Sequence, residues 1–430
     1  MQMKLINRPD YMNRLRELRD HHLIKVVTGV RRCGKSTLLE MFADELRVSG
    51  VTEGQIQFYN FEDPDVYSIG DWKQIYDHIK VRLLPDKMNY LFLDEVQNID
   101  TFERLVDGLF IKKNCDVYVT GSNAMLLSGE LATLLTGRYL QISIQPFSFA
   151  EYSRALAAAP KPQNNIDSES YGDLHIESMI HNSLTGNKSL YRYLFEGGMP
   201  QAVELRQTTT AADDFLNGII DTIVERDIFQ RHEIYTKPTF QKVIDFAMDS
   251  VGSLVSSASI AGTLKNDGIA VDRKTVVQYL DYLSSAFLLY KVPRYDVKGK
   301  NLLRTLEKYY LSDTGFRRAR LKREAETDLG HLLENVVYLE LRRRYKSVFV
   351  GKWNEHEIDF VTTDWQGYTS YYQVALTAFG EEALERELRP LLAVRDSNMK
   401  FLLTTDLDGN PVFDGIRKLN VVDWLLRIDG

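Results

Sequence analysis

Cysteine is scarce in this chain. Only Cys33 and Cys115 occur among its 430 residues, which excludes a disulfide scaffold and indicates a reducing compartment. No cysteine or histidine spacing fits a zinc site. Apolar runs are short as well: none approaches the roughly 18 residues that a membrane-spanning helix needs, and residues 1–8 lack the apolar core of a signal peptide. We therefore expect a cytoplasmic protein without a membrane contact.

Positive charge is also in deficit. Lysine and arginine number 53 against 60 aspartate and glutamate residues, and the net charge of −7 argues against a strongly basic nucleic-acid-binding protein. The stretch 291–323 departs from this average, because it carries eleven basic residues and only three acidic ones. Such a local basic face can bind phosphate even on an acidic protein.

The most informative motif lies at residues 29–36, which read G-V-R-R-C-G-K-S and match the pattern G-x-x-x-x-G-K-[ST]. An apolar run precedes it and a helix-like run follows, which is the strand–loop–helix context that a phosphate-binding loop requires. The glycines let backbone N–H groups turn toward one point, and the helix adds its positive end. The residues predicted to surround a bound nucleotide are Gly29, Val30, Arg31, Arg32, Cys33, Gly34, Lys35, Ser36 and Thr37.

A second nucleotide signature follows the apolar run 90–93, which is typical of a buried parallel strand. We expect Lys35 to reach the β- and γ-phosphates of ATP, and Ser36 and Asp94 to hold Mg²⁺. Glu95 is the candidate catalytic residue that polarises the attacking water. Cys33 is interpreted as a filler of the loop and not as a redox sensor.

Two further catalytic candidates stand near the next strands. A small polar residue after the strand 116–120 would lie beside the γ-phosphate, and Asn123 or Ser122 is the candidate; the alternative is a turn that caps a helix. Arg138 precedes the strand 140–144 and would stabilise transition-state charge within one subunit or across a subunit boundary. The alternative for Arg138 is a surface ion pair. Alternation of strands and helices through this region predicts a parallel α/β sheet.

Together these motifs resemble the AAA-superfamily ATPases of bacteria and archaea. More narrowly, the chain is similar to a group that carries an ATPase domain, a small helical or winged-helix region, and a C-terminal nuclease-like domain of unknown function. The resemblance rests on T-G-V-R-R-C-G-K-S-T-L-L (28–39), L-D-E-V-Q (93–97), T-G-S (120–122), G-R (137–138) and F-S-F-A-E-Y (147–152). It implies an AAA+ core, and a helical lid that starts at the Gly-Gly-Met-Pro turn 197–200.

Residues 238–292 have the rhythm of three helices followed by a strand, which is typical of a winged helix-turn-helix. Winged helices contact DNA or merely join domains, and both readings stay open. The basic stretch extends the predicted surface for double-stranded DNA over residues 238–323. Residues 155–175, rich in alanine, proline, asparagine and serine, are the best candidate for a linker.

The C-terminal region resembles PD-(D/E)xK nucleases in its order of helix and strands. Glu334 and Asp359 match the metal-ligand positions of that pattern. Gln373 and Ala375 stand where an acid and a lysine are expected, so we interpret Glu334, Asp359 and Gln373 as a vestigial nuclease site in a restriction-endonuclease-like α/β domain. The alternative is a polar structural network.

The predicted domains are therefore an ATPase core (1–154), a linker with a helical lid (155–235), a winged helix (236–310) and a degenerate nuclease-like domain (311–430). The expected function is Mg²⁺-dependent ATP binding and hydrolysis, coupled to the remaining modules and to DNA. The rival is a nucleotide-gated scaffold with negligible turnover and a protein partner. A metal-dependent nuclease is a third option, and oligomerisation is left open.

Overall fold

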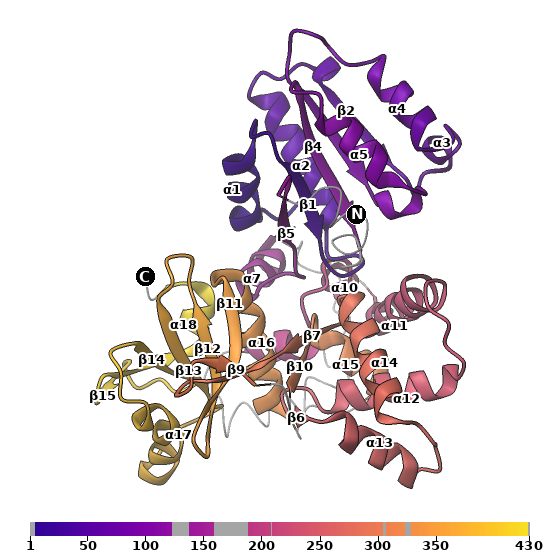
Figure 1. Ribbon diagram of the computed structural model, residues 1–430. Helices are drawn as coiled ribbons and strands as arrows, with labels where there is room; N and C mark the ends of the chain where they lie inside the picture. Colours follow the sequence, from indigo (N-terminus) through magenta and orange to yellow (C-terminus); the bar gives the residue numbers. More distant parts are fainter. Residues whose placement is uncertain are drawn as a thin grey trace. The chain divides into compact units, whose positions relative to one another are not determined.

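The computed structural model describes residues 5–122, 137–158, 188–207, 209–303, 307–322 and 328–428. The chain divides into two compact units (Figure 1). The nucleotide unit comprises Ile6–Pro146 together with Ser285–Phe287. The second unit comprises Phe147–Ser284 and Leu288–Gly430, with Met1–Leu5. Each unit contains its own sheets and helices, and each is described separately.

A five-stranded, wholly parallel sheet forms the centre of the nucleotide unit, in the order β2-β3-β4-β1-β5. Every residue of β1, β3 and β4 is buried, as expected for apolar strands that are covered on both faces. The predicted parallel α/β sheet is thus confirmed. The strands are β1 (Ile24–Thr28), β2 (Ile56–Asn60), β3 (Asn89–Asp94), β4 (Cys115–Gly121) and β5 (Tyr139–Ser143).

Local sequence explains where the helices of this unit begin. Pro9 occupies the first turn of α1, where its missing N–H costs nothing. Asp71 and Gln74 form a capping box that starts α4. Gly34, in the left-handed region, precedes α2 and ends the phosphate loop. The helices are α1 (Pro9–Leu18), α2 (Lys35–Val48), α3 (Pro64–Tyr67), α4 (Trp72–Lys80) and α5 (Phe102–Phe110).

The second unit begins with helices and a tight turn. Its first described helices are α7 (Phe149–Ala158), α9 (Lys188–Glu196), α10 (Pro200–Arg206) and α11 (Ala212–Thr222), and a π-helical segment (Ile223–Phe229) continues α11. The predicted Gly-Gly-Met-Pro turn joins α9 to α10. Gly197 has a φ of +71°, and a Cβ there would lie 1.9 Å from Asp313 Oδ1. The turn therefore requires glycine because a buried carboxylate fills its inner side.

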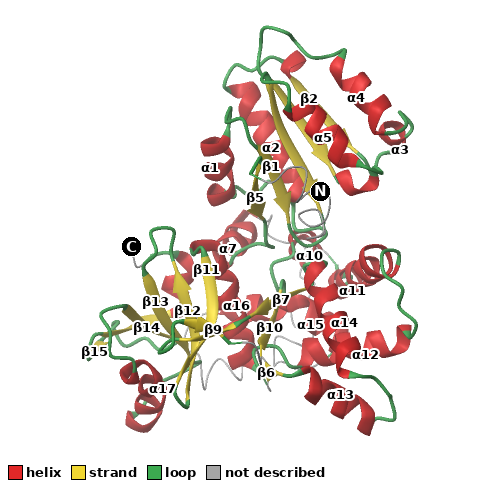
Figure 2. Ribbon diagram, viewed as in Figure 1, coloured by secondary structure: helices red, strands yellow, loops and turns green. Residues whose placement is uncertain are grey.

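A small antiparallel sheet with three helices follows, and its strand order is β6-β10-β7. Figure 2 shows these strands and helices in the second unit. The elements are α12 (Lys237–Asp249), β6 (Leu254–Val255), α13 (Ser257–Asn266), α14 (Arg273–Ser285), β7 (Leu289–Val292) and β10 (Glu307–Leu311). The two short strands between β7 and β10 pair with the larger sheet of this unit and not with β7 or β10.

The larger sheet has eight strands in the order β15-β16-β14-β13-β12-β11-β8-β9 and mixes parallel with antiparallel pairs. Its elements are β8 (Arg294–Asp296), β9 (Asn301–Leu302), β11 (Ser347–Trp353), β12 (His356–Thr363), β13 (Thr369–Val374), β14 (Met399–Thr404), β15 (Val412–Phe413) and β16 (Ile416–Asn420). The helices here are α15 (Thr314–Leu321), α16 (Leu329–Arg344), α17 (Glu381–Ala393) and α18 (Val421–Leu426). A helix, three antiparallel strands, a helix and a parallel strand thus follow one another from α16 to β14.

Across the described part of the chain, no helix combines the length and the apolar character that crossing a lipid bilayer demands.

Asp313 should be the residue on which the glycine turn depends. Its carboxylate accepts the N–H of Gly198 at 2.6 Å and that of Gly315 at 2.9 Å, in a fully buried setting. We expect Asp313→Ala to lower the free energy of unfolding by about 2–4 kcal/mol, because two buried donors lose their acceptor. Chemical denaturation followed by circular dichroism measures the loss.

Asp364→Ala is the matched control. Asp364 also accepts two backbone N–H groups, from Gln366 and Tyr368, but in a turn on the surface. Water replaces the carboxylate there, so we expect a loss below about 1 kcal/mol. Equal losses in the two variants would contradict the role assigned to burial of Asp313.

Candidate functional site

The phosphate loop joins the end of β1 to the start of α2 in a conformation that only glycine allows. Gly29 has a φ of +152°, and a Cβ there would lie 2.2 Å from the carbonyl oxygen of Ile144. Gly34 has a φ of +98°. Arg32, also with positive φ, is exposed at the tip of the loop. The loop therefore keeps the tight backbone path that directs N–H groups toward a bound anion.

Lys35 is the charged centre of this loop. Its ammonium donates to the carbonyls of Gly29 at 3.2 Å and Val30 at 3.5 Å, and it lies 3.6 Å from Glu95 Oε1. The side chain is only 3% exposed. A buried ammonium that donates long, weak hydrogen bonds to carbonyl oxygens can exchange these acceptors for phosphate oxygens, which are stronger acceptors.

Asp94 ends β3 beside Thr120 of β4. The Thr120 hydroxyl donates to Asp94 Oδ1. Burial raises the pKa of Asp94, and the hydroxyl groups of Thr120 and Ser36 oppose that rise. The second oxygen, Oδ2, is buried without a hydrogen-bond partner.

This orphaned oxygen is the test of whether the site fits Mg²⁺. Mg²⁺ is commonly held by one or two carboxylates together with substrate phosphates, and not by an all-protein cage. A buried carboxylate oxygen that lacks a donor, with the Ser36 hydroxyl near the same carboxylate, meets that requirement. Ser36 and Asp94 would thus hold the ion.

Glu95 follows Asp94 in an unusual backbone conformation. Its φ of +55° is left-handed, and its N–H donates to the Thr120 hydroxyl at 2.9 Å. Burial alone would raise the pKa of Glu95, but the Lys35 ammonium, the Gln97 amide and Arg31 outweigh it and lower the pKa below its usual range. Glu95 is therefore a carboxylate at neutral pH, the form a base requires.

Arg8 supports the loop from behind, a role that the sequence did not signal. Its guanidinium is buried and donates to the carbonyls of Cys33 at 3.1 Å and Gln145 at 2.7 Å. Because the peptide bonds are trans, holding the Cys33 carbonyl on one side directs the Gly34 N–H to the other. Burial raises the pKa of Cys33, so its thiol stays protonated, in keeping with a filler.

Of the remaining catalytic candidates, Ser122 lies at the edge of the sheet that carries the loop, since Gly121 pairs in register with Thr28. Ser122 is buried just beyond β4, and Asn123 lies outside the described residues. Arg138 precedes β5, whose first residue pairs in register with the first residue of β1, whereas the loop follows the last residue of β1. Arg138 thus stands at the opposite edge of the sheet, 2.7 Å from Asp107. This contact is the surface ion pair that was the alternative for Arg138. The position does not support action on its own phosphate loop, and action across a subunit boundary stays a prediction.

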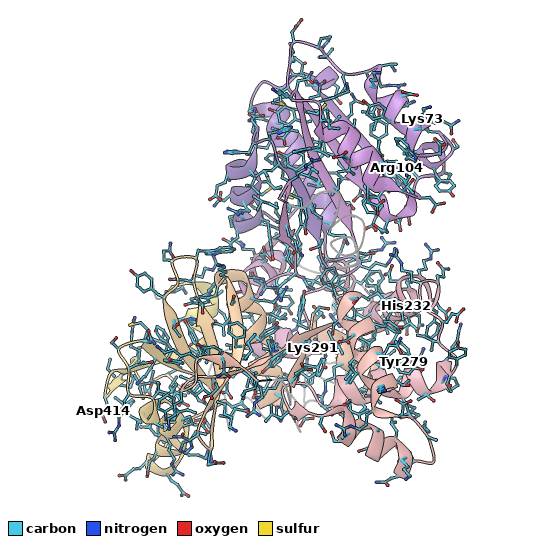
Figure 3. All side chains as sticks on the ribbon, in the orientation of Figure 1. Lys73, Arg104, His232, Tyr279, Lys291 and Asp414 are labelled. Carbon is cyan, nitrogen blue, oxygen red and sulfur yellow. The ribbon has the colours of Figure 1, made fainter. Side chains whose placement is uncertain are left out.

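Among the described residues of the basic stretch 291–323, six cations are paired with carboxylates. Lys291, labelled in Figure 3, contacts Asp281 and Glu307 at 3.3 and 3.2 Å. The other basic residues of this stretch with carboxylate partners are Arg294, Lys308, Arg317, Arg318 and Arg320. Nearly all of these carboxylates come from outside the stretch, so the local count overstates its net positive charge, and the surface for double-stranded DNA stays a prediction.

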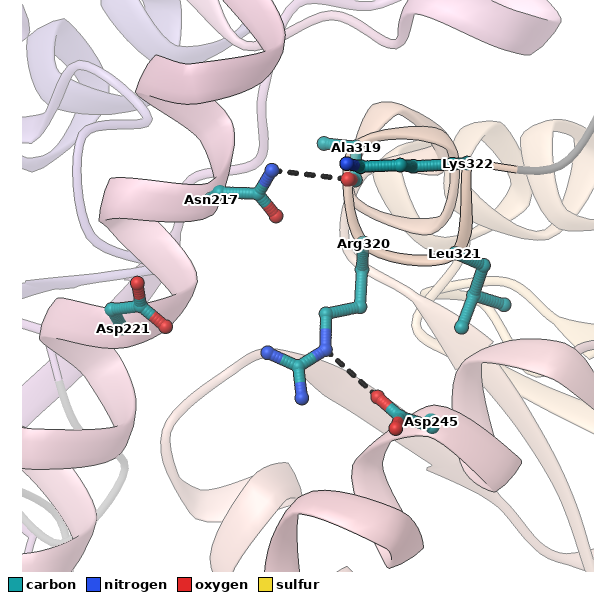
Figure 4. Close-up of a pocket in the computed structure, with 7 residues that line it drawn as sticks. All are labelled: Asn217, Asp221, Asp245, Ala319, Arg320, Leu321 and Lys322. Atoms are coloured by element: carbon teal, nitrogen blue, oxygen red, sulfur yellow. Dashed lines mark hydrogen bonds and ion pairs between the residues drawn. The ribbon is translucent and has the colours of Figure 1, made fainter.

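A polar groove of about 460 Å³ between α11, α12 and α15 illustrates this pairing (Figure 4). Arg320 reaches into it but donates to Asp245 at 2.8 Å. Asn217 is bound to the Ala319 carbonyl at 3.0 Å. The groove therefore offers no concentrated positive charge to a phosphate.

The vestigial nuclease residues lie together, with an ammonium among them. Glu334 Oε1 accepts from Lys308 at 2.8 Å, and the Val374 N–H donates to Asp359 at 2.9 Å. Gln373 contacts the Asp359 backbone N–H at 3.4 Å. The inference that this site lacks a lysine ammonium is wrong, because Lys308 supplies one from β10, some 67 positions before Ala375 in the chain.

Lys308 neutralises this cluster. It also contacts Glu357 Oε1 at 2.8 Å, and its side chain is 4% exposed. Burial alone would lower the pKa of Lys308, but Glu334, Asp359 and Glu357 outweigh it and raise the pKa. Burial and the Glu334 carboxylate raise the pKa of Asp359 well above its usual range. Among the described residues, no three acidic, histidine or cysteine side chains are grouped to hold a metal ion.

We expect Lys308→Met to destabilise the second unit by about 3–5 kcal/mol, because it leaves the buried Glu334 without its ammonium partner. Lys291→Met is the control, since Lys291 pairs with two carboxylates but is one-third exposed. We expect the control to lose less than about 1 kcal/mol in urea unfolding. Similar losses in both would show that the cluster does not depend on the buried ammonium.

Two segments of this chain match known protein families. Residues 21–153 match the family model of an AAA domain, and residues 187–327 match that of a domain of unknown function, DUF8612. An uncharacterized protein of Methanocaldococcus jannaschii is 27% identical over 79% of this chain and 71% of its own length. The Walker-type ATPase of Pyrococcus abyssi covers 74% of this chain and 96% of its own, with 13% identity and a TM-score of 0.45.

An uncharacterized protein of Haemophilus influenzae is similar over almost the entire chain. It is 35% identical over 428 residues, which is 99% of this chain and 100% of the relative. The match thus spans the AAA domain of this chain. This chain therefore belongs to the same family as the Haemophilus protein, and its residues 21–153 match an AAA domain.

Proposed function

We propose that this protein binds ATP with Mg²⁺ and hydrolyses it, in the cytoplasm. The observation that carries the proposal is the arrangement of Lys35, Asp94 and Glu95 around one loop, with Lys35 Nζ 3.6 Å from Glu95 Oε1. Lys35 and the loop N–H groups bind the phosphates. Mg²⁺, when bound by Ser36 and Asp94, neutralises phosphate charge. Glu95 accepts the proton of the attacking water.

We further infer that Arg138 acts on the nucleotide of a neighbouring copy in an oligomer. Its place at the amino edge of the sheet, with a half-exposed side chain, supports this reading. A guanidinium supplied by a neighbour stabilises charge that develops in phosphoryl transfer. Its ion pair with Asp107 keeps the guanidinium in a fixed position.

The second unit is proposed to contain a winged helix and a degenerate nuclease-like domain. The order of α12, β6, α13, α14, β7 and β10 supports the first, and the order from α16 to β14 supports the second. The strands β8 and β9, which would form the wing, pair instead within the eight-stranded sheet. This pairing, together with the ion pairs of residues 291–322, favours a protein partner over double-stranded DNA for this unit.

Glu95→Gln should separate binding from turnover. We expect steady-state ATP hydrolysis with Mg²⁺ to fall at least about 100-fold, because the amide cannot accept the proton of water. ATP affinity should stay within about threefold, since Lys35 and the loop are intact. Glu53→Gln, at an exposed site, is the control and should retain full activity.

Duplex DNA is added in the same assay to compare the two kinds of partner. ATP hydrolysis that requires Glu95 and does not change in rate when DNA is added supports the proposal. Stimulation by DNA would contradict the protein partner. If wild type binds ATP but hydrolyses it no faster than Glu95→Gln does, the protein is a nucleotide-gated scaffold and not an enzyme.

Arg8→Met should weaken ATP binding by about tenfold, because the Cys33 carbonyl loses the donor that orients the loop. The control is Arg16→Met, since Arg16 pairs with Glu45 on the surface and does not contact the loop. Affinity is measured by calorimetry on both variants. A tenfold loss in Arg16→Met, or none in Arg8→Met, would contradict the role assigned to Arg8.

A further inference from the structure

We propose that Thr120 is a positioning residue that sets the orientation of both active-site carboxylates through a single hydroxyl group. The inference rests on the proposed function, because Asp94 and Glu95 are the residues it positions. Among the hydrogen bonds described, the Thr120 side chain contacts Asp94 and Glu95 and no residue of the phosphate loop. Its hydroxyl donates to Asp94 Oδ1 and accepts from the Glu95 N–H at 2.9 Å.

The direction of each bond follows from elementary hydrogen-bond chemistry. A hydroxyl has one proton to donate and two lone pairs that accept. The Glu95 N–H can only donate, so it must take a lone pair of the Thr120 oxygen. The single Thr120 proton is then free to go to Asp94, which as a carboxylate can only accept. The three groups therefore have one consistent arrangement, with no alternative that exchanges donors and acceptors.

The first consequence concerns Asp94. Because Oδ1 is held by Thr120, the carboxylate cannot turn freely, and Oδ2 is left buried without a protein donor. A buried carboxylate oxygen that no N–H or O–H satisfies is costly unless a cation completes it. Thr120 thus keeps one oxygen of Asp94 available to Mg²⁺ while it satisfies the other.

The second consequence concerns Glu95. A left-handed φ of +55° costs a residue with a Cβ on the order of 1 kcal/mol, and such conformations persist only where the surroundings hold them. The bond from the Glu95 N–H to Thr120 is such a restraint. It fixes the turn that carries the Glu95 side chain toward Lys35, at 3.6 Å.

The position of Thr120 in the sheet makes this restraint rigid. Thr120 lies on β4, the strand between β1 and β3, and pairs in register with Val27. It is fully buried, and a β-branched side chain on a strand has few accessible rotamers. The hydroxyl is therefore held by the strand that separates the loop from the carboxylates, and one group aligns the expected metal ligand with the expected base.

A graded set of substitutions tests the proposal. Thr120→Val keeps the shape and removes the hydroxyl, Thr120→Ser keeps the hydroxyl, and Thr120→Cys offers a weaker donor. The measured quantity is the affinity for a non-hydrolysable ATP analogue, determined by calorimetry with Mg²⁺ and again with EDTA. We call the ratio of the two affinities the magnesium gain.

We expect Thr120→Val to reduce the magnesium gain by about tenfold, which corresponds to one lost bond to a charged group. Its affinity in EDTA should stay within about twofold of wild type, since the loop and Lys35 are unchanged. Thr120→Ser should retain the gain within about threefold, and Thr120→Cys should fall between them. Where turnover is measured, kcat should follow the same order.

Two results would overturn the proposal. The first is a magnesium gain in Thr120→Val equal to that of wild type. The second is a magnesium gain in Thr120→Ser as low as in Thr120→Val, which would assign the effect to packing. Thr404→Val serves as the stability control, because Thr404 is a buried threonine at the end of β14 that accepts the Asp406 N–H. If wild type lacks turnover, the proposed hydrolysis fails, but the magnesium gain still decides the role of Thr120.

Discussion

The structure of the nucleotide unit depends on how two consecutive buried carboxylates are accommodated at the end of one strand. Asp94 and Glu95 are 1% and 7% exposed, and burying charge is expensive unless each group is paired or hydrogen-bonded. The chain meets this cost unequally. Glu95 receives an ammonium and an amide, whereas Asp94 is approached by hydroxyl groups alone and its Oδ2 has no hydrogen-bond partner. That inequality gives the two carboxylates different roles.

The phosphate loop supplies the opposite charge, and its geometry depends on parts of the chain far away in sequence. Gly29 must lack a side chain because the carbonyl of Ile144 passes close by, and Arg8 holds the far side of the loop through Cys33. A single edge of a parallel sheet collects all of these groups, since β1, β3 and β4 end there together. The site is therefore a property of the sheet edge and not of the loop alone.

The sequence predicted those features that a local pattern encodes. The loop 29–36, the parallel sheet, and the strand that ends in Asp94 and Glu95 follow from spacing and apolar runs, since both act over a few residues. Arg8 and Thr120 gave no such signal, because their partners lie more than 20 positions away. The sequence did not show the position of Arg138 either. A residue that precedes a strand stands at the amino end of that strand, and only the strand pairing shows at which edge of the sheet this end lies.

Charge was the least predictable property. The excess of basic residues in 291–323 predicted a phosphate-binding face, but carboxylates from α11, α12, α14 and α16 pair with five of these residues in space. The same applies to the cluster at Glu334, where Lys308 of β10 supplies an ammonium that the local motif lacks. Net charge along a sequence describes a surface only when its residues stay exposed, and in the second unit many do not.

The most direct test of the central account is a calorimetric titration of the protein with ATP, with Mg²⁺ and with EDTA, for wild type and for Asp94→Asn. The account predicts that Mg²⁺ strengthens ATP binding to wild type by at least about tenfold and leaves the affinity of Asp94→Asn unchanged, because the free carboxylate oxygen is the ligand of the ion. Equal strengthening by Mg²⁺ in both proteins, or no binding of ATP to wild type, would contradict it.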